Sequence, residues 1–317
     1  MASSLSTYLK LSAEIKKGSR AFLEKMRVLG TQYTTLSVFK NASIESFNTL
    51  KNAEGQPLIK RFRAKEVVLV RDIQDELDAN ISIEENFIRL LTTDFINKQL
   101  TNINSISLEK LNANPMLCSA LKLSNLQDLL KFYVYSLATR SIVTSMGYLI
   151  QNLLLYSNSE VYDGKYDSAG DHVKWDLIID RLDGVKHYIE VKSGPNDLDK
   201  GQVKSYAKEI QLVEEAGHKG YIGIAYGKKS SDAISINLFK TYLDEWETKT
   251  LIGKELWSFV SLDDSYHEIL VLRMAETAQI ILANQSIITL IDNKINDLTL
   301  EFNEKYNSIE EYIAQLW

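Results

Sequence analysis

The stretch from Asp176 to Lys192, DLIIDRLDGVKHYIEVK, constrains the fold more than any other part of the chain. It begins with an apolar, β-branched run, continues with an Asp-Gly turn signal, and alternates over residues 185–191 well enough for a second strand. The pattern predicts a β-hairpin. Glu190 and Lys192 are two residues apart and so share one face of their strand, while Asp176 starts the other strand. We therefore expect two carboxylates and one lysine to meet at one edge of a sheet.

These residue types fit a magnesium site that hydrolyses phosphodiester bonds. Mg²⁺ prefers oxygen ligands, and it can polarise a phosphate and lower the pKa of a bound water. Asp176 and Glu190 would supply carboxylates, and the carbonyl of Val191 would supply a third oxygen. Lys192 would stabilise negative charge or help to position and deprotonate the water. Asp180 and Asp183 are assigned to the strand end and the turn, with Asp180 as the second choice of ligand. An ordinary cross-strand ion cluster is the alternative, so the neighbouring sequence has to decide.

The rest of the chain predicts helices on both sides of a short sheet. Residues 1–65 look mainly helical, and residues 67–70 fit either a strand or a buried helix. The remaining predictions are a helix over 83–100, a long helix from the N-cap Ser124 to about Tyr156, a helix capped by Asp197 or Asp199 that runs through Gln202, Tyr206, Ile210 and Val213, strands over 221–226 and 233–238, a loop turning into a helix over 251–259, and a largely helical segment over 266–317. This order indicates an α/β core between helical additions.

Several motifs in this frame resemble a known family. Asp176 followed by Glu190-Val191-Lys192 matches the PD-(D/E)XK nuclease superfamily, with Trp-Asp in place of Pro-Asp. The SGPN loop after the lysine, GIAYG in the next strand and IGKELWSF further on are similar to a type II restriction endonuclease, in particular to the subgroup that cuts sites with a GGNCC core. The resemblance covers roughly residues 140–260. Relatives often carry a glutamate where this chain has Gln151, which makes Gln151 an accessory candidate with an amide in place of a carboxylate.

The resemblance implies a PD-(D/E)XK restriction-endonuclease-like α/β core, a mixed central sheet flanked by helices, with large N- and C-terminal helical additions. We expect three regions. Residues 1–123 would be a mainly helical region with DNA contacts, residues 124–262 the catalytic core, and residues 263–317 an acidic helical region for dimerisation.

Candidate DNA contacts follow the catalytic lysine directly. Ser193 begins a loop in which backbone can approach a phosphate closely, and it is followed by Asn196, Lys200, Gln202 and Lys204. The lysines share one helix face with Lys208, for which a solvated face is the alternative. A second basic cluster, KRFRAK at 60–65, is either a phosphate-contacting segment or a solvated face.

Charge is distributed unevenly along the chain. The net charge is −6, but residues 241–317 carry 5 basic and 14 acidic residues, whereas residues 1–240 carry 31 and 28. The acidic C-terminal part is thus a poor DNA surface and a better candidate for dimer contacts. No apolar run is long enough for a membrane span, and one cysteine, Cys118, leaves neither a disulfide framework nor a cysteine-rich zinc site.

These observations predict a Mg²⁺-dependent type II restriction endonuclease that cleaves double-stranded DNA at a short palindromic site. A two-fold site suggests a homodimer. A cognate DNA methyltransferase is the expected genetic companion, and a bacterial or archaeal cytoplasm the expected location. Two alternatives stay open: a structure-specific repair or junction-resolving nuclease with the same core, and a non-catalytic DNA-binding protein.

Overall fold

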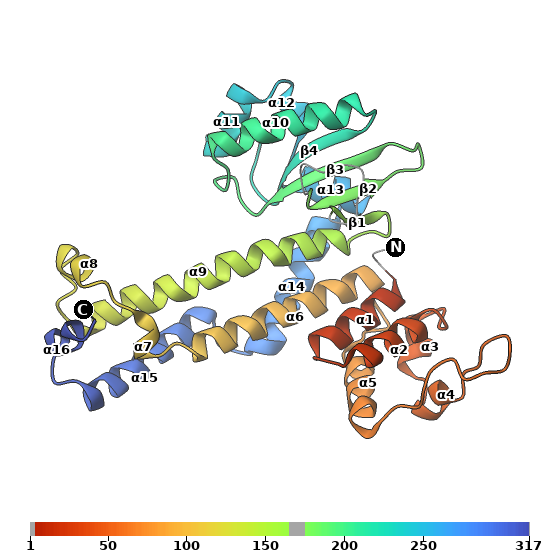
Figure 1. The fold of residues 1–317 in the computed structure, drawn as a ribbon, viewed down its shortest axis with the longest axis horizontal. Helices are drawn as coiled ribbons and strands as arrows, with labels where there is room; N and C mark the ends of the chain where they lie inside the picture. Colours follow the sequence, from red (N-terminus) through yellow and green to blue (C-terminus); the bar gives the residue numbers. More distant parts are fainter. Residues whose placement is uncertain (1–3, 165–174, 317) are drawn as a thin grey trace. The chain divides into compact units, whose positions relative to one another are not determined.

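The computed structural model describes residues 4–164 and 175–316 of the 317-residue chain. The chain divides into two compact units: unit 1 comprises Met1–Leu91 and Ile150–Met274, and unit 2 comprises Thr92–Leu149 and Ala275–Trp317. The division runs through the helices α6 (Ile83–Asn104), α9 (Leu126–Leu155) and α14 (Tyr266–Leu282), which are labelled in Figure 1. Each unit combines segments that are distant in the sequence. The three regions expected from the sequence were defined by their expected roles in DNA contact, catalysis and dimerisation. Those roles stay predictions.

The N-terminal part of unit 1 is helical, as predicted. Its helices are α1 (Leu5–Ile15), α2 (Arg20–Gly30), α3 (Leu36–Lys40), α4 (Ile44–Asn48) and α5 (Ala64–Glu76). Four of them begin at a Ser or Thr whose hydroxyl accepts a hydrogen bond from a backbone N–H in the first turn: Ser4, Ser19, Thr35 and Ser43. Residues 67–70 belong to α5, because Val70 and Ile73 bury one helical face in a core shared with Phe39 and Phe47.

A five-stranded sheet forms the other part of unit 1. Its strands are β1 (Val161–Asp163), β2 (Leu177–Asp180), β3 (Lys186–Lys192), β4 (Lys219–Ile224) and β5 (Thr250–Ile252), paired in sequence order. The β1–β2 and β2–β3 pairs are antiparallel, whereas β3–β4 and β4–β5 are parallel. The predicted hairpin and the predicted mixed central sheet flanked by helices are therefore confirmed.

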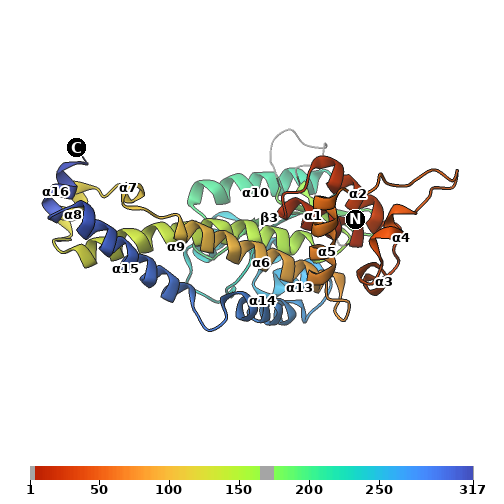
Figure 2. The same cartoon turned by 90° about the horizontal axis from the view of Figure 1, so that it is seen from below.

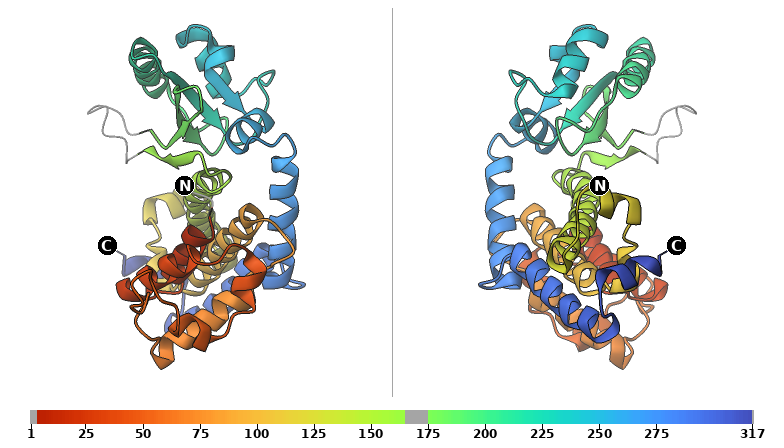
Figure 3. Two further views of the ribbon diagram at one scale, coloured as in Figure 1. Left: turned by 90° about the vertical axis from the view of Figure 1, so that its right-hand side faces the viewer. Right: turned by 90° about the vertical axis from the view of Figure 1, so that its left-hand side faces the viewer.

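Helices cover both faces of the sheet (Figure 3). On one face, Val203 of α10 (Lys200–Glu215) and Phe239 of α11 (Ile234–Tyr242) pack against Ile222 in a buried cluster that also receives α12 (Trp246–Lys249). On the other face, a Cβ built on Gly223 would lie 2.8 Å from a methyl of Leu256 in α13 (Lys254–Ser261). Because side chains alternate along a strand, Glu190 and Lys192 lie on the α10 face of β3.

Three local predictions were wrong. Residues 233–238 are not a strand but part of α11, where Ile236 and Phe239 are buried three residues apart, a helical rather than a strand period. Thr250–Ile252 is not a loop but the strand β5, which is buried throughout as strands of parallel sheets are. The cap of α9 is Asn125, whose Oδ1 accepts a 2.8 Å hydrogen bond from the backbone N–H of Asp128, and not Ser124.

Unit 2 is helical. Besides its parts of α6, α9 and α14 it contains α7 (Leu108–Leu111), α8 (Pro115–Ala120), α15 (Ile287–Lys305) and α16 (Ile309–Ala314), which Figure 2 shows together at one end of α9. The apolar stripe predicted for the long helix is confirmed, since Leu130 and Val134 of α9 are buried against Ile295 and Leu298 of α15. Among the described residues, no helix is long and apolar enough to cross a membrane.

Candidate active site

The register of the hairpin brings Asp176 to the strand that carries Glu190 and Lys192. Asp176 directly precedes β2, in which Leu177 pairs with Ile189 of β3. The Oδ2 atom of Asp176 accepts a 2.8 Å hydrogen bond from the backbone N–H of Val191, and its Oδ1 atom accepts one of 2.9 Å from Nε2 of Gln151. The aspartate is thus fixed between the C-terminal part of α9 and the end of β3.

Glu190 and Lys192 form a hydrogen-bonded cluster with a tyrosine of α10. Glu190 is buried, and its Oε1 atom accepts 2.6 Å hydrogen bonds from both the Lys192 ammonium and the Tyr206 hydroxyl. Lys192 also donates to the hydroxyl oxygen of Tyr206 at 3.3 Å. The structure therefore brings the three predicted catalytic residues and Gln151 to one edge of the sheet and adds Tyr206.

The electrostatics of the cluster follow from burial and mutual charge. Burial, reinforced by the neighbouring Glu190, raises the pKa of Asp176 to about 6, although the hydrogen bond from Val191 opposes the shift. Burial lowers the pKa of the Lys192 ammonium, but its ion pair with Glu190 outweighs that effect and holds the pKa above its ordinary value. Burial and Glu190 together raise the pKa of Tyr206 to about 12, so its hydroxyl remains a donor.

The oxygen atoms at this edge fit a hard divalent cation. The N–H and C=O of a strand residue point to the same side, so the carbonyl of Val191 faces the side from which Asp176 accepts its hydrogen bond. Both hydrogen bonds to Glu190 use Oε1, and none from the described residues reaches Oε2. Two close carboxylates concentrate negative charge, which a cation would relieve. In residues 4–164 and 175–316, this edge included, no group of three or more His, Cys, Asp or Glu residues is placed to hold a metal ion, so only two carboxylates and a backbone carbonyl are available here.

The loop after Lys192 is fixed by its own side chains. Ser193 donates a 2.7 Å hydrogen bond to Asp197, and Asn196 accepts a 3.3 Å bond from the backbone N–H of Ile234. Gln202 forms a capping box with Asp199, which makes Asp199 the N-cap of α10. Three of the predicted DNA contacts thus also hold the loop and the helix start in place.

The two predicted lysines of α10 lie over an aromatic ring. The Nζ atoms of Lys200 and Lys204 are 5.2 and 4.9 Å from the ring centroid of Tyr242 in α11. Both lysines are exposed, so the ring orients their ammonium groups at the surface.

Asp180 lies where its assignment to the strand end predicts. It ends β2 opposite Lys186, at the other end of the strand from Asp176, so its second-choice role as a ligand of the same site is excluded. The sequence pattern places Tyr206 on the apolar face of its helix and indicates only a packing role. In the structure its hydroxyl also donates a hydrogen bond to Glu190. The one available signal was its place on the helix face that also carries Ile210, which packs on the sheet.

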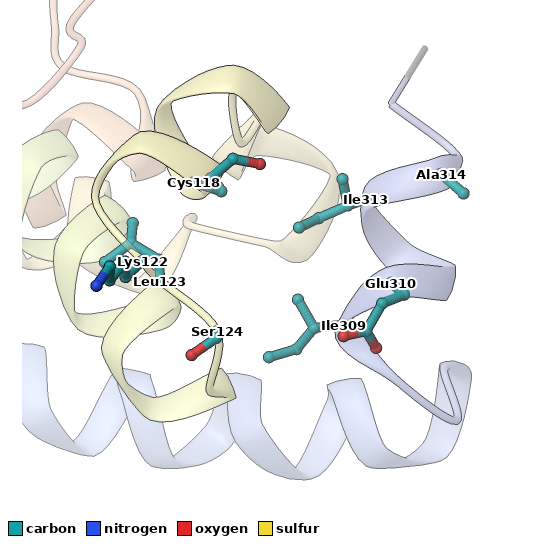
Figure 4. Close-up of a pocket in the computed structure, with 9 residues that line it drawn as sticks. Cys118, Lys122, Leu123, Ser124, Ile309, Glu310, Ile313 and Ala314 are labelled. Atoms are coloured by element: carbon teal, nitrogen blue, oxygen red, sulfur yellow. The ribbon is translucent and has the colours of Figure 1, made fainter.

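Unit 2 contains a separate cavity of about 680 Å³. Ile309 and Ile313 of α16 face Cys118 and Leu123 across it (Figure 4). None of the predicted site residues lines this cavity, and apolar side chains dominate its walls.

The comparison with known families shows which family the chain belongs to. The sequence model of the family described as type II restriction endonuclease EcoO109I matches residues 82–280, more than half of the chain. This chain belongs to the EcoO109I family of type II restriction endonucleases. It is therefore a type II site-specific deoxyribonuclease that binds double-stranded DNA, which decides against both alternatives raised from the sequence. A search among curated proteins gave no match.

The EcoO109I-family match covers the whole site. Gln151, Asp176, Glu190, Lys192 and Tyr206 all lie inside it, and it extends beyond the predicted limits of 140 and 260 on both sides. Restriction endonucleases of this kind generally use divalent metal ions, in agreement with the oxygen ligands described above. Residues 1–81 and 281–317 lie outside the match.

Proposed function

We propose that this endonuclease uses Mg²⁺ to hydrolyse double-stranded DNA at a short palindromic site with a GGNCC core, with Asp176, Glu190 and Lys192 as its catalytic residues. The proposal rests mainly on two carboxylates and one ammonium that lie together at the C-terminal end of β3. Asp176 accepts a hydrogen bond from the backbone of Val191, and Glu190 accepts one from Lys192. The GGNCC core is carried over from the resemblance of the IGKELWSF and SGPN segments.

Three oxygen donors of the site would hold the cation: the carboxylates of Asp176 and Glu190 and the carbonyl of Val191. When bound there, Mg²⁺ would polarise the scissile phosphate and lower the pKa of a bound water. Gln151 would keep Asp176 oriented through its 2.9 Å hydrogen bond, without adding a further negative charge. In the reaction, the hydroxyl of water adds to phosphorus, the bond to the leaving sugar oxygen breaks, and a proton passes to that oxygen.

Lys192 would act as a positive charge rather than as the base. Its raised pKa keeps the ammonium protonated, because Glu190 accepts its hydrogen bond at 2.6 Å. A fixed ammonium beside the phosphate stabilises the negative charge that grows on the phosphate oxygens as water attacks. The proton of the attacking water therefore goes elsewhere, to solvent or to the phosphate itself.

The test is cleavage of unmethylated plasmid DNA by the purified protein in Mg²⁺. We expect discrete fragments whose sequenced ends share one GGNCC-containing palindrome. Lys192→Ala and Asp176→Asn should abolish the fragments, whereas Lys208→Ala, a control on the exposed part of α10, should keep them. No cleavage in Mg²⁺ or Mn²⁺ would refute the catalytic assignment, and fragments with unrelated ends would refute the specificity alone.

The DNA contacts proposed for this site are Ser193, Asn196, Lys200, Gln202 and Lys204. The orientation of the two exposed lysines over Tyr242 supports phosphate contacts at the start of α10. Replacing both lysines by Gln should weaken binding to cognate and unrelated duplexes alike. A weakening confined to the cognate duplex would instead indicate base recognition.

A homodimer and a cognate DNA methyltransferase complete the proposal, with residues 124–262 as the catalytic core and residues 263–317 providing dimer contacts. The helices α14 and α15 expose large apolar side chains, which supports such contacts: Val271, Leu272, Ile280, Ile288 and Leu300. Sedimentation should give twice the mass of the chain, and Ile280→Lys should lower it. Plasmid methylated by the companion enzyme should resist cleavage.

A further inference from the structure

Residues 50–65 form a basic arm in unit 1, outside the region that the family model matches. The arm carries five basic residues and one acidic residue, Glu54. It begins with a hairpin that projects beyond the neighbouring helices in two perpendicular views (Figures 1 and 2). The family match therefore does not account for this basic arm.

The hairpin is ordered by its own hydrogen bonds. The backbone N–H of Leu58 donates a 2.8 Å hydrogen bond to the carbonyl of Leu50, and Lys51 and Pro57 form an isolated antiparallel β-bridge. The side chain of Asn52 accepts the backbone N–H groups of Glu54 and Gln56 at 3.0 and 2.9 Å. A connected turn of this kind holds its side chains in fixed positions, unlike a flexible tail.

Apolar anchors fix the second half of the arm to the helical core. Ile59 is buried, and the ring of Phe62 packs edge-on against Phe22 and Phe47 with centroids 6.1 and 6.4 Å apart. The backbone N–H of Phe62 donates to the side chain of Asn48, and Lys25 donates to the carbonyl of Arg61. The basic side chains between these anchors are consequently left at the surface.

Four of the five cations of the arm have no acidic partner among the described residues, whereas Arg63 lies near Glu66. Lys51, Lys60, Arg61 and Lys65 are all exposed, and none forms an ion pair with another described residue. Other surface lysines of the chain do, for example Lys98 with Asp94 at 2.6 Å. Like charges held close together repel one another, and a polyanion relieves that repulsion.

A hollow of about 570 Å³ lies between the hairpin and the anchored segment. Two of the unpaired cations, Lys60 and Arg61, line it together with Asn48, Gln56 and Pro57. Ammonium, guanidinium and amide N–H groups are the donors that bind phosphate oxygens in protein–DNA complexes.

We propose that the basic arm is a second DNA-binding site, which holds backbone phosphates of the duplex without reading its sequence. The inference rests on the proposed function only in taking duplex DNA as the substrate. Because phosphate contacts carry no sequence information, the arm adds affinity equally to cognate and unrelated DNA.

The experiment compares two triple variants of the full chain that each remove three positive charges. The arm variant is Lys51→Gln, Lys60→Gln, Arg61→Gln, and the control is Lys10→Gln, Lys17→Gln, Arg20→Gln, which removes three exposed cations from the α1–α2 region. Affinity for duplexes of about 30 base pairs, with and without the cleaved sequence, is measured by fluorescence anisotropy over a salt series without metal.

We expect the arm variant to lower the slope of log affinity against log salt by about 2 to 3, roughly 0.9 for each phosphate that the arm no longer neutralises. Affinity for both duplexes should fall by the same factor, while the single-turnover cleavage rate at saturating enzyme stays unchanged. The control should change the slope by less than about 1. Lys60→Arg with Arg61→Lys should keep the wild-type slope, which separates the effect of charge from misfolding.

Three results would overturn the proposal. Equal slope changes in both triple variants would indicate a general charge effect, and an unchanged slope in the arm variant would exclude the site. A change in sedimentation mass without a change in DNA affinity would assign the arm to contacts between copies of the chain. Failure of the wild-type protein to bind any duplex would instead count against the proposed function.

Discussion

The hydroxyl of Tyr206 donates a 2.6 Å hydrogen bond to Oε1 of Glu190, the same oxygen that accepts from the ammonium of Lys192. The bond connects α10 to β3. It also directs both donors to one carboxylate oxygen, which leaves Oε2 free of hydrogen bonds from the described residues. Tyr206 is thus placed to position Glu190 for a cation rather than to take part in the chemistry itself.

The first prediction concerns this hydroxyl. Tyr206→Phe keeps the ring and removes the donor, so Glu190 can rotate and share its oxygens differently. We expect the single-turnover rate to fall about tenfold, equivalent to about 1.4 kcal/mol, and the affinity for Ca²⁺ to weaken while DNA affinity is retained. Tyr221→Phe is the control, because its hydroxyl makes no hydrogen bond with the described residues. Similar reductions in both variants would disprove a specific role.

The second prediction is that Asp176 costs stability. Its pKa is about 6 in the folded protein and about 3.9 in an unfolded chain, so the folded state binds the proton more tightly. The free energy of unfolding contributed by this group is therefore highest below pH 4 and falls as pH rises towards 6. Asp176→Asn should be more stable than wild type at pH 8, by on the order of 1 kcal/mol, although inactive.

The difference between the two proteins should shrink towards zero at pH 4. Urea denaturation without metal at both pH values measures it. The asparagine can keep both hydrogen bonds, since Gln151 can turn its amide to offer the carbonyl oxygen. A variant less stable than wild type at pH 8 would show that the hydrogen bonds of Asp176 outweigh its buried charge.

The third prediction links the same pKa to metal binding. A proton on Asp176 competes with a cation, so affinity for Ca²⁺ in the absence of DNA should decline as pH falls below about 6, approaching tenfold per pH unit. Titration calorimetry at several pH values measures this dependence. Asp180→Asn should leave it unchanged, because Asp180 lies at the far end of β2. A pH-independent affinity would exclude Asp176 as a ligand.

The fourth prediction concerns Gln151, whose amide donates a hydrogen bond to Asp176. Gln151→Glu places a third carboxylate in the cluster and removes a donor. Without metal, the midpoint temperature of unfolding should therefore fall. About 10 mM Mg²⁺ should raise that temperature more than it does in wild type, because the ion binds only the folded site. Gln151→Leu is the matched control without added charge, and it should gain nothing from Mg²⁺ beyond the wild-type shift.

The clustering of the two carboxylates and the lysine could be predicted because its geometry is local. Asp176, Glu190 and Lys192 lie on one hairpin, and the two-residue period of a strand fixes which side chains share a face. The hairpin turn then sets the register. The long helix α9 was equally accessible, since its apolar stripe persists over many turns.

The parts that sequence alone missed depend on contacts between distant segments. The role of Tyr206 requires the rotation of α10 against β3, which no local pattern encodes. The short segments 234–242 and 250–252 contain apolar runs that fit a helix or a strand equally well, and only their burial in the sheet layers separates them. The compact units follow the same rule, since each joins segments from two parts of the chain.

The last prediction tests what the IGKELWSF segment does for the fold. Gly253 has φ of +61°, and its N–H donates a 2.8 Å hydrogen bond to the carbonyl of Ile224 at the end of β4. A Cβ added there would lie 2.6 Å from the carbonyl oxygen of Gly227. Four residues on, the indole N–H of Trp257 donates to the carbonyl of Ala225. These contacts hold the ends of β4 and β5 in place, so the segment stabilises the sheet next to β3. Gly253→Ala should therefore destabilise the protein by about 2 kcal/mol or more.

The control is Gly147→Ala, in the middle of α9 with open space around its added Cβ, which should stabilise the protein by about 0.5–1 kcal/mol. Urea denaturation midpoints measure both, and shifts of the same sign would contradict this account.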